Sequence, residues 1–375
     1  MNVPKLRFKE FNDEWINNCL SDIATITMGQ SPSSKNYTSN KNNIILIQGN
    51  ADLNNGHVVP RIFTTQITKT CNINDIIITV RAPVGDTAIS DYNACIGRGV
   101  CAISGDKYIY HYLNYLKIND YWKKISKGST IDSITSNDIK NLNINFPNST
   151  EAKKIVKTLD SLDKKIELQS KKIEDLKLFK KGLNKFIFSN CTDEYKVENL
   201  IIEYNDKTTE NNQYKVLSST ANGITFQNEY FNKQAASNNN TGYKIIPKGF
   251  ITYRSMSDTG EFHFNIQDIT DIGIVSPAYP VFNIKKNLVN KTYFVYYINE
   301  NDGFKNEILS TKEGGTRYAL SITKFKTLNI LLPKIEEQIK YSKYINVIIN
   351  KIQIEEKKLE KLVQFKKGLM QNMFV

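Results

Sequence analysis

Apolar residues recur at alternating spacings of three and four in two long stretches of the chain. The seam positions of the first stretch are Ile155, Leu159, Leu162, Ile166, Gln169, Ile173, Leu176 and Leu183. Those of the second are Tyr341, Ile345, Ile348, Ile352, Glu355, Leu359, Leu362 and Leu369. This spacing is typical of a helix that presents a heptad seam to another helix. The pattern therefore predicts two long helices, over residues 151–190 and 337–375.

Both seams are interrupted by a polar residue at the same place, Gln169 in one and Glu355 in the other. Polar residues at seam positions commonly set the register and the number of helices that pair. We therefore expect the two helices to pair antiparallel about a pseudo-two-fold axis, with these two side chains in contact. The alternative is that each helix packs separately on its own domain.

The two helical stretches belong to an internal duplication. An offset of 186 residues aligns 52 pairs without a gap, and 20 of these pairs are identical, where chance predicts about three. The pentapeptide Phe-Lys-Lys-Gly-Leu occurs in both copies, as Phe179–Leu183 and Phe365–Leu369. The duplication predicts that the protein is built on a two-fold plan.

Residues 1–150 and 191–336 have a different pattern from the helices. Short apolar runs alternate there with Gly, Asn, Asp and Pro, which indicates β-strands joined by turns. Ile76–Arg81 and Phe250–Arg254 are similar runs, each ending in Arg at the start of a polar loop. The fold class expected is α+β, with two globular mixed α/β domains separated by two long helices that form an antiparallel coiled coil.

Charge and composition narrow the functional classes. The net charge is +12, and more than half of it lies in residues 151–195 and 337–375. This excess favours an anionic partner, although solvated helix faces would account for it equally well. The five cysteines form no Cys-x-x-Cys pair and only three histidines occur, so we expect a reducing cytoplasm and no metal site. No apolar leader or membrane span is expected.

The sequence contains no motif that indicates catalysis. A Gly-x-x-x-x-Gly-Lys-Ser/Thr phosphate loop is absent, which leaves an ATP-driven motor without support. The three scattered histidines do not assemble a nucleophile with its base. We therefore expect a non-enzymatic chain with no cofactor of its own.

Three motif groups, each present twice, carry a resemblance that covers essentially the whole chain. They are the Gly-x-Thr loops (Gly128–Thr130, Gly314–Thr316), the Leu-Asn-Ile…Pro…Glu entries to the helices (Leu142–Glu151, Leu328–Glu337) and the pentapeptide exits. With the opening Leu6–Trp15, they resemble the specificity subunits of type I restriction–modification systems. The first copy has Glu151–Ala152 where the family commonly has Glu-Gln, as in Glu337–Gln338. We expect this departure to alter a contact at the helix start.

The resemblance implies that each globular segment is a target recognition domain that reads one half of a bipartite, asymmetric double-stranded DNA sequence. The helices would set the unread spacer and dock two modification (methyltransferase) subunits, and restriction subunits would join that complex. S-adenosylmethionine, ATP and magnesium would then belong to the partner subunits. The alternative is a stand-alone DNA-binding protein or a coiled-coil scaffold without a methyltransferase partner.

Polar or cationic residues on loops after strands are the candidates for contact with bases or phosphates. They are Gln48, Asn50, Arg81, Arg98, Lys127 and Thr130 in the first domain, and Ser218, Ser219, Asn222, Arg254, Thr316, Arg317 and Tyr318 in the second. As an alternative, Arg81 and Arg254 would pair with Asp86 and Asp258 to brace loops, and the Gly-x-Thr loops would shape the junction with the helices. The pentapeptide lysines are expected to meet DNA phosphate or a partner subunit.

Overall fold

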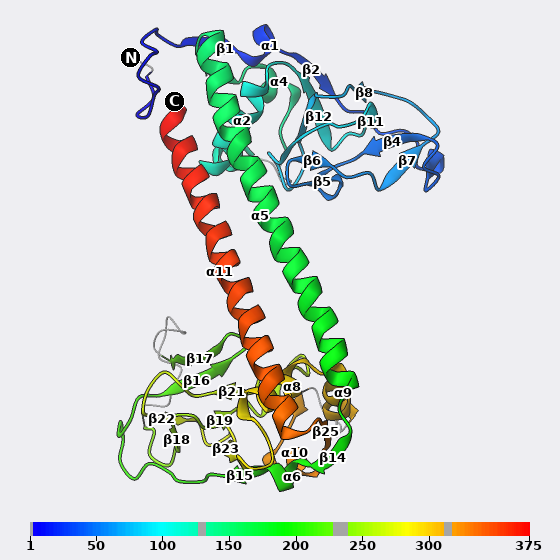
Figure 1. Ribbon diagram of the computed structural model, residues 1–375. Coiled ribbons are helices and arrows are strands. Elements are labelled where there is room, and N and C mark those ends of the chain that lie inside the picture. The colour runs from blue at the N-terminus through cyan, green and yellow to red at the C-terminus, as the bar shows by residue number, and fades with distance from the viewer. Residues whose placement is uncertain (1–2, 127–132, 228–238, 311–316) are drawn as a thin grey trace. The chain divides into compact units, whose positions relative to one another are not determined.

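The computed structural model describes residues 3–126, 133–227, 239–310 and 317–375. Figure 1 shows the expected order of a globular domain, a long helix, a second globular domain and a second long helix. By their contacts, residues 1–173 and 355–375 form one compact unit and residues 174–354 form the other. Each unit therefore contains one globular domain and one part of each long helix. The predicted fold class is confirmed.

The first globular domain is a mixed β structure with short helices. Its strands are β1 Ile16–Cys19, β2 Thr25–Met28, β3 Tyr37–Thr38, β4 Ile44–Ile47, β5 Leu53–Asn54, β6 His57–Val58, β7 Ile62–Thr64, β8 Thr70–Cys71, β9 Ile76–Thr79, β10 Thr87–Ile89, β11 Ala94–Ile96, β12 Val100–Ser104 and β13 Asn143–Phe146. Its helices are α1 Leu20–Ile23, α2 Lys107–Ile118, α3 Tyr121–Ser126 and α4 Ser136–Lys140. One sheet has the order β2-β12-β9-β10-β6-β5 and another the order β3-β7-β4-β11-β8.

The core of this domain forms around β9, whose four residues are all buried. A continuous apolar run suits this strand because it lies between β12 and β10. Helix α2 begins where the Asp106 carboxylate accepts a hydrogen bond from the backbone N–H of Tyr108. Tyr108 and Leu113 of this helix are fully buried in the same core.

The second globular domain also consists of short strands, which its described residues arrange in smaller sheets of two or four strands. The strands are β14 Asp193–Lys196, β15 Ile201–Glu203, β16 Leu217–Thr220, β17 Gly223–Phe226, β18 Lys244–Pro247, β19 Ile251–Thr252, β20 Met256–Ser257, β21 Asn265–Ile266, β22 Ile272–Val275, β23 Val281–Ile284, β24 Tyr318–Ala319 and β25 Asn329–Leu332. Its helices are α6 Val197–Leu200, α8 Lys291–Glu300, α9 Asp302–Ser310 and α10 Ile322–Thr327. The Asn290 side chain caps α8 by accepting from the backbone N–H of Tyr293, as Asp106 caps α2.

The long helices are α5, Ser149–Ser189, and α11, Ile335–Met373. Every predicted seam position is buried or half-buried, as expected for a paired helix. In the first unit, Ile155, Leu159 and Leu162 are buried, and in the second Tyr341 and Ile345 are. None of the helices among the described residues is both long enough and apolar enough to span a membrane.

The predicted contact at the polar seam position is confirmed. The Gln169 side-chain amide donates to a carboxylate oxygen of Glu355 at 2.8 Å and to its backbone carbonyl at 2.9 Å. Lys172 and Lys358 donate to the other carboxylate oxygen at 2.9 and 3.2 Å. The carboxylate is 6% exposed and fully hydrogen-bonded, so the helices pair directly and the alternative of separate packing is wrong.

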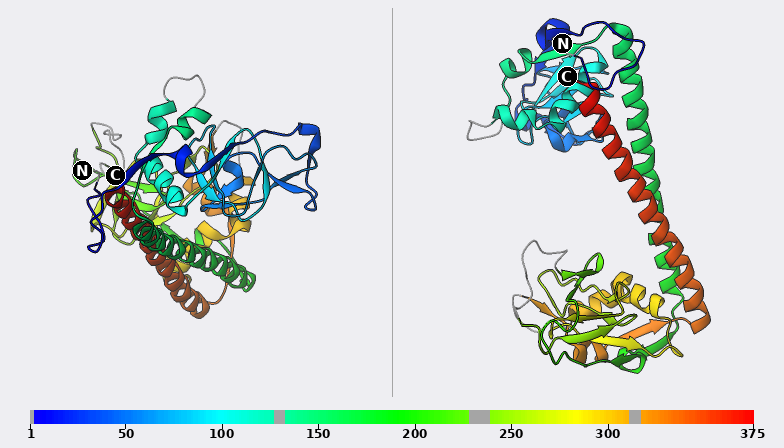
Figure 2. Two further views of the ribbon diagram at one scale, coloured as in Figure 1. Left: turned by 90° about the horizontal axis from the view of Figure 1, so that it is seen from above. Right: turned by 90° about the vertical axis from the view of Figure 1, so that its left-hand side faces the viewer.

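The end of α11 is part of the first domain's core. Phe374 is buried among Tyr108, Tyr112 and Tyr115, and its ring lies 5.4 to 5.8 Å from theirs. The carbonyl oxygen of Val375 accepts from the Tyr112 hydroxyl at 3.2 Å. Figure 2 marks both chain ends at this domain.

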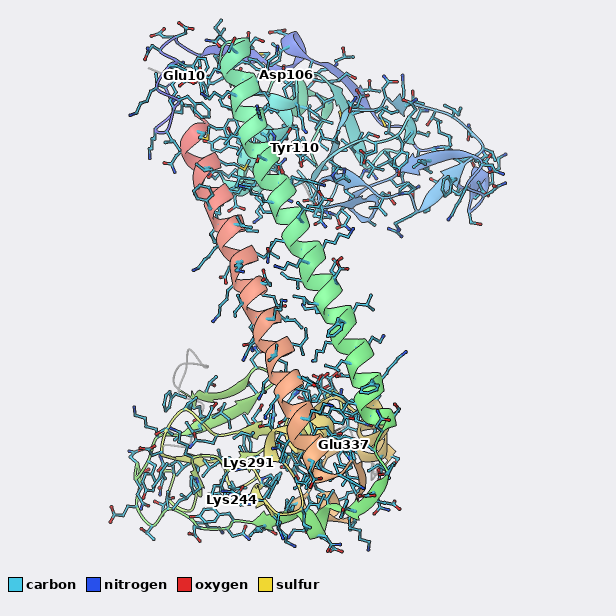
Figure 3. All side chains as sticks on the ribbon, viewed as in Figure 1. Glu10, Asp106, Tyr110, Lys244, Lys291 and Glu337 are labelled. Carbon is cyan, nitrogen blue, oxygen red and sulfur yellow. The ribbon has the colours of Figure 1, made fainter. Side chains whose placement is uncertain are left out.

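The two helix starts differ, as the sequence predicts. Glu151 is fully buried and accepts two hydrogen bonds of 2.8 Å from Arg7, while the Trp15 indole donates to it at 3.2 Å. In the second copy Glu337 is exposed on the first turns of α11 (Figure 3). There the buried amide of Gln338 instead donates to the Pro333 carbonyl at 2.8 Å and accepts from the Asn290 backbone at 2.9 Å.

The seam carboxylate predicts a dependence of stability on pH. Hydrogen bonds from Gln169 and then Lys172 lower the pKa of Glu355 from 4.5 to about 2. Because the folded pKa is the lower one, the stabilisation is present above the unfolded pKa and is lost as the pH falls through the folded value. The Glu355→Gln variant has no such proton to take up. Its deficit in melting temperature relative to the unchanged chain should therefore shrink on going from about pH 6 to about pH 3.

Thermal unfolding followed by circular dichroism at both pH values measures this difference. Glu360→Gln, an exposed position on the same helix, is the matched control and should show a smaller change with pH. A deficit that stays constant over the whole range would rule out the lowered pKa.

Candidate nucleic-acid interface

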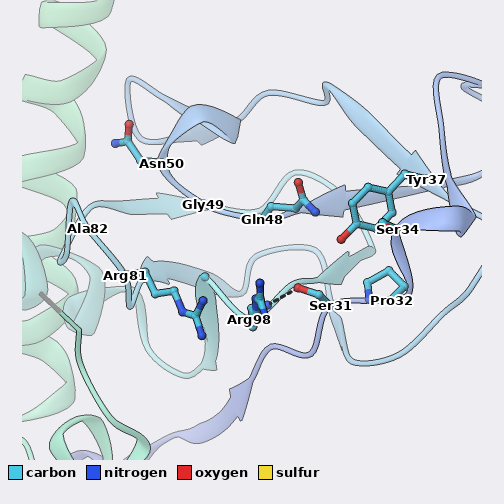
Figure 4. Close-up of a pocket in the computed structure, with 11 residues that line it drawn as sticks. Ser31, Pro32, Ser34, Tyr37, Gln48, Gly49, Asn50, Arg81, Ala82 and Arg98 are labelled. Atoms are coloured by element: carbon cyan, nitrogen blue, oxygen red, sulfur yellow. Dashed lines mark hydrogen bonds between the residues drawn. The ribbon is translucent and has the colours of Figure 1, made fainter. Parts of the chain in front are cut away.

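Four predicted residues of the first domain come together around one hollow of about 450 Å³. Figure 4 shows Gln48, Asn50, Arg81 and Arg98 around it, on three different loops. Sequence reasoning missed the other polar side chains of the lining, which are Ser31, Ser34 and Tyr37. These three lie between β2 and β4, with Tyr37 in the short strand β3, and no local sequence pattern marks them as part of a site.

Strand pairing explains why these loops meet. β4 and β11 are parallel neighbours, with Leu46 opposite Cys95 and Ile47 opposite Ile96. The carboxyl ends of neighbouring parallel strands lie at the same edge of a sheet. Gln48 follows β4 directly and Arg98 follows β11 after Gly97, so the two residues are brought side by side.

The backbone that carries Arg98 is tightly packed. A Cβ atom on Gly99 would lie 2.0 Å from the Gln48 carbonyl oxygen, and one on Gly29 would lie 2.1 Å from the Gly97 carbonyl oxygen. Only glycine allows the chain to approach itself this closely. The backbone N–H of Arg98 also donates to the Ser31 hydroxyl at 3.0 Å. The turn is thus held on both sides, and the arginine side chain projects from it into solvent.

The alternative in which Arg81 pairs with Asp86 is wrong. Asp86 instead forms an ion pair with Lys117 and accepts a hydrogen bond from the Asn50 side chain. Asn50 is therefore already engaged within the domain. Arg81 and Arg98 are both exposed, and within the described parts of the chain neither forms an ion pair with a carboxylate.

In the second domain some of the predicted residues are exposed and others are buried. Asn222 is exposed in the two-residue turn that joins β16 to β17. Ser218 and Ser219 are buried in β16. The Ser219 hydroxyl accepts from the Asn265 side chain at 2.8 Å, which occupies it inside the domain. In this conformation Asn222 is the member of this group that offers surface to a ligand.

Arg317 forms the ion pair with Asp258 that the alternative interpretation assigned to Arg254. Its Nε atom lies 2.8 Å from the Asp258 carboxylate, while Arg254 is exposed. Tyr318, the next residue, is half-buried in β24, which pairs with β20. Arg254 is therefore the exposed cation of this group that keeps its charge uncompensated among the described residues.

The supposed equivalence of Arg81 and Arg254 is also wrong. The Val80 carbonyl accepts from the Ile134 backbone at 2.9 Å, and the Ser255 carbonyl accepts from the Leu320 backbone at 2.9 Å. Ile134 and Leu320 are separated by the repeat offset of 186 residues. Val80 and Ser255 are thus equivalent positions. The counterpart of Arg81 is therefore Met256, and the counterpart of Arg254 is the buried Thr79. Local sequence similarity misaligned the two strands by two residues.

Lys127, Thr130 and Thr316 lie outside the described residues, as do the two Gly-x-Thr loops. Their roles stay predictions. Of the pentapeptide lysines, Lys180 pairs with Glu300 at 2.8 Å and Lys366 pairs with Asp163. Both of these first lysines therefore hold the helices to neighbouring parts of their own unit, and the second lysines of the pentapeptides are exposed.

One cluster has the composition of a metal site, His111 with Asp160 and Asp163. Asp160 already binds Lys107 at 2.9 Å and His111 Nε2 at 2.9 Å, and Asp163 binds Lys366. Burial lowers the pKa of His111. The lysines balance both carboxylates, so the cluster is explained as the ionic contact that joins α2 to the two long helices.

Gly99 gives a test of how the Arg98 turn is held. Gly99→Ala should lower the free energy of unfolding by about 1–3 kcal/mol, because the new methyl group displaces the Gln48 carbonyl. Gly368→Ala is the control, since no atom lies within 4 Å of a Cβ there. That change in a helix should raise stability by about 0.5–1 kcal/mol. Urea denaturation measures both, and a Gly99→Ala variant as stable as the unchanged chain would show that the turn has room to move.

The family described as Type I restriction modification DNA specificity domain matches the chain twice, over residues 12–178 and 194–364. The "Putative type I restriction enzyme MjaX specificity subunit" of Methanocaldococcus jannaschii is 34% identical over 164 residues. That match covers 42% of this chain and 38% of the relative, so it spans well under half of the relative's length.

Two solved structures are similar over nearly the whole chain. The S subunit of the type I restriction-modification system from M. genitalium has a TM-score of 0.65 at 17% identity, covering 100% of this chain and 99% of that one. A chain from a structure describing complex assembly and conformational transition of the type I R-M system has a TM-score of 0.55 at 16% identity. It covers 97% of this chain and 98% of that one. At these identities the likeness establishes the fold.

Proposed function

Because the chain belongs to the family of type I restriction modification DNA specificity domains, we propose that it is the DNA-reading subunit of a cytoplasmic type I restriction–modification complex. Each globular domain reads one half of a bipartite double-stranded DNA target. The subunit itself is non-catalytic. S-adenosylmethionine, ATP and magnesium are bound by the modification and restriction subunits that join it.

The observation that carries this proposal is the pair of matched domains with unlike polar surfaces. The first domain presents a hollow with two exposed arginines, Arg81 and Arg98, beside Gln48. The second presents Asn222 on a hairpin turn and Arg254. Arginine pairs readily with guanine, and glutamine or asparagine with adenine. Two unlike surfaces on a duplicated frame support an asymmetric target with two different half-sites.

The long helices supply the rest of the proposal. The duplicated frame offers two equivalent helix surfaces, and two modification subunits dock on them. Phe179 and Phe365, at equivalent positions of the pentapeptides, are 62% and 58% exposed. Large aromatic side chains that remain exposed on paired helices are typical of surfaces that a partner covers.

A stand-alone DNA-binding protein or a coiled-coil scaffold is the competing function. A scaffold would show no salt-dependent DNA binding, because that dependence comes from cations displaced at phosphates. A stand-alone regulator would bind its site without a methyltransferase. A specificity subunit should bind well only when it is produced together with modification subunits.

Methylation-sensitive sequencing of host DNA with and without the gene tests the proposal. A bipartite, asymmetric methylated motif should appear only when the gene is present. Binding assays with that motif then test the first domain's hollow. Arg98→Ala should weaken binding by about 1–3 kcal/mol with changes of base preference confined to one half-site.

Lys41→Ala, an exposed cation elsewhere in the same domain, is the control and should leave the base preference unchanged. An equal loss on all DNA sequences for Arg98→Ala would assign this arginine to phosphate contact. The absence of any gene-dependent methylated motif would count against the function itself.

A further inference from the structure

The two copies of the long helix carry the same exposed basic stripe. Its members on α5, within the first unit, are Lys154, Lys157, Lys165 and Leu168, and the equivalent members on α11, within the second unit, are Lys340, Lys343, Lys351 and Ile354. All eight side chains are exposed, and among them Lys154 is already paired with Glu10. Their spacing places each set of four on one face of its helix. A surface kept in both copies is suited to binding the same partner twice.

Three positions beside this stripe are polar in the first copy and apolar in the second. The copy on α5 has Lys153, Thr158 and Ser161, and the copy on α11 has Ile339, Tyr344 and Val347. The three apolar side chains on α11 are 42%, 48% and 66% exposed. Both copies of this surface therefore carry lysines, but the neighbours of those lysines are polar in the first unit and apolar in the second.

The surroundings of the first stripe strengthen the contrast. A hollow of about 810 Å³ lies between α5 and α11 in the first unit, with Phe365 and Leu369 in its lining. Lys153, Lys157 and Lys165 line the same hollow, and within the described residues none of the three has a carboxylate partner. Uncompensated lysines around an apolar floor suit a partner that supplies acidic side chains.

The chemistry of the stripes selects the occupant. A second copy of this chain is disfavoured because its own charge is +12 and its helices are basic. DNA is disfavoured on the second stripe because its phosphates would pair with the lysines but leave the apolar side chains of Ile339, Tyr344 and Val347 without a suitable contact. A protein with a surface that is partly apolar and partly acidic satisfies both stripes. Under the proposed function, this protein is the modification subunit.

Building on that function, we propose that the two stripes bind two copies of the modification subunit with unequal dependence on salt. The copy on the first unit is held largely by charge, which salt screens. The copy on the second unit also contacts Lys340, Lys343 and Lys351, but in addition it buries the three apolar side chains, and salt does not weaken that burial. Raising the salt concentration therefore releases the first copy and leaves the second in place.

The test uses the full chain produced together with a type I modification subunit and purified as a complex. Size-exclusion chromatography with light scattering gives the composition of the complex at about 0.1 M and about 0.6 M sodium chloride. We expect two modification subunits per chain at the lower concentration and one at the higher. The affinity of the released copy should fall at least tenfold between the two salt concentrations. This corresponds to a loss of about 1.4 kcal/mol of binding free energy.

Exchanging the diverged residues identifies which copy is released. The variant Ile339→Lys, Tyr344→Thr, Val347→Ser gives the second stripe the character of the first, and should retain no modification subunit at high salt. The matched variant Lys153→Ile, Thr158→Tyr, Ser161→Val makes the opposite change and should retain two. All six positions are exposed or half-buried on the helix surface, and an unchanged melting temperature confirms that each variant is folded.

The other outcomes overturn the inference. Two subunits released together, or variants that behave like the unchanged chain, would show that the diverged positions do not decide binding. A complex with a second copy of this chain on a stripe would assign the surface to self-association. No modification subunit at either salt concentration would overturn the proposed function, and this inference with it.

Discussion

The contact between Gln169 and Glu355 is the point on which the helical frame depends. An apolar heptad seam alone permits several registers, because one apolar side chain fits against another with little preference. A buried carboxylate permits few, since it loses its hydrogen bonds when the helices slide. Gln169, Lys172 and Lys358 together satisfy this carboxylate. The polar position therefore specifies the alignment that the apolar positions stabilise.

That alignment determines what the end of α11 can reach. One residue of displacement shifts a helix by about 1.5 Å and rotates its side chains by about 100°. Met370 and Phe374 are buried in the first domain's core, and the Val375 carbonyl receives hydrogen bonds from Tyr112 and Asn145. These contacts require the register set at the seam. The last residues of the chain are thus a structural part of the first domain.

The two recognition surfaces show how one frame supports different chemistry. In the first domain, parallel pairing of β4 and β11 places Gln48 beside Arg98, and close packing at Gly29 and Gly99 holds the turn. In the second domain, Arg317 is committed to Asp258. Of the two predicted arginines there, Arg254 is the one without a carboxylate partner among the described residues, and its structural counterpart in the first domain is a buried threonine. Charged positions have therefore moved relative to the strands while the helices kept their pattern.

The sequence by itself determined the duplication, the two helices, their seam and the contact of Gln169 with Glu355, because heptad periodicity is a local pattern that repeats along the chain. It also identified Gln48, Arg81 and Arg98 as candidates, since each follows an apolar run. Only the tertiary structure decided that these three share one hollow, that Asp86 binds Lys117, that Ser219 faces inward and that Met256 is the counterpart of Arg81. Each of these depends on which distant strands pair and in what register, and short apolar runs specify neither.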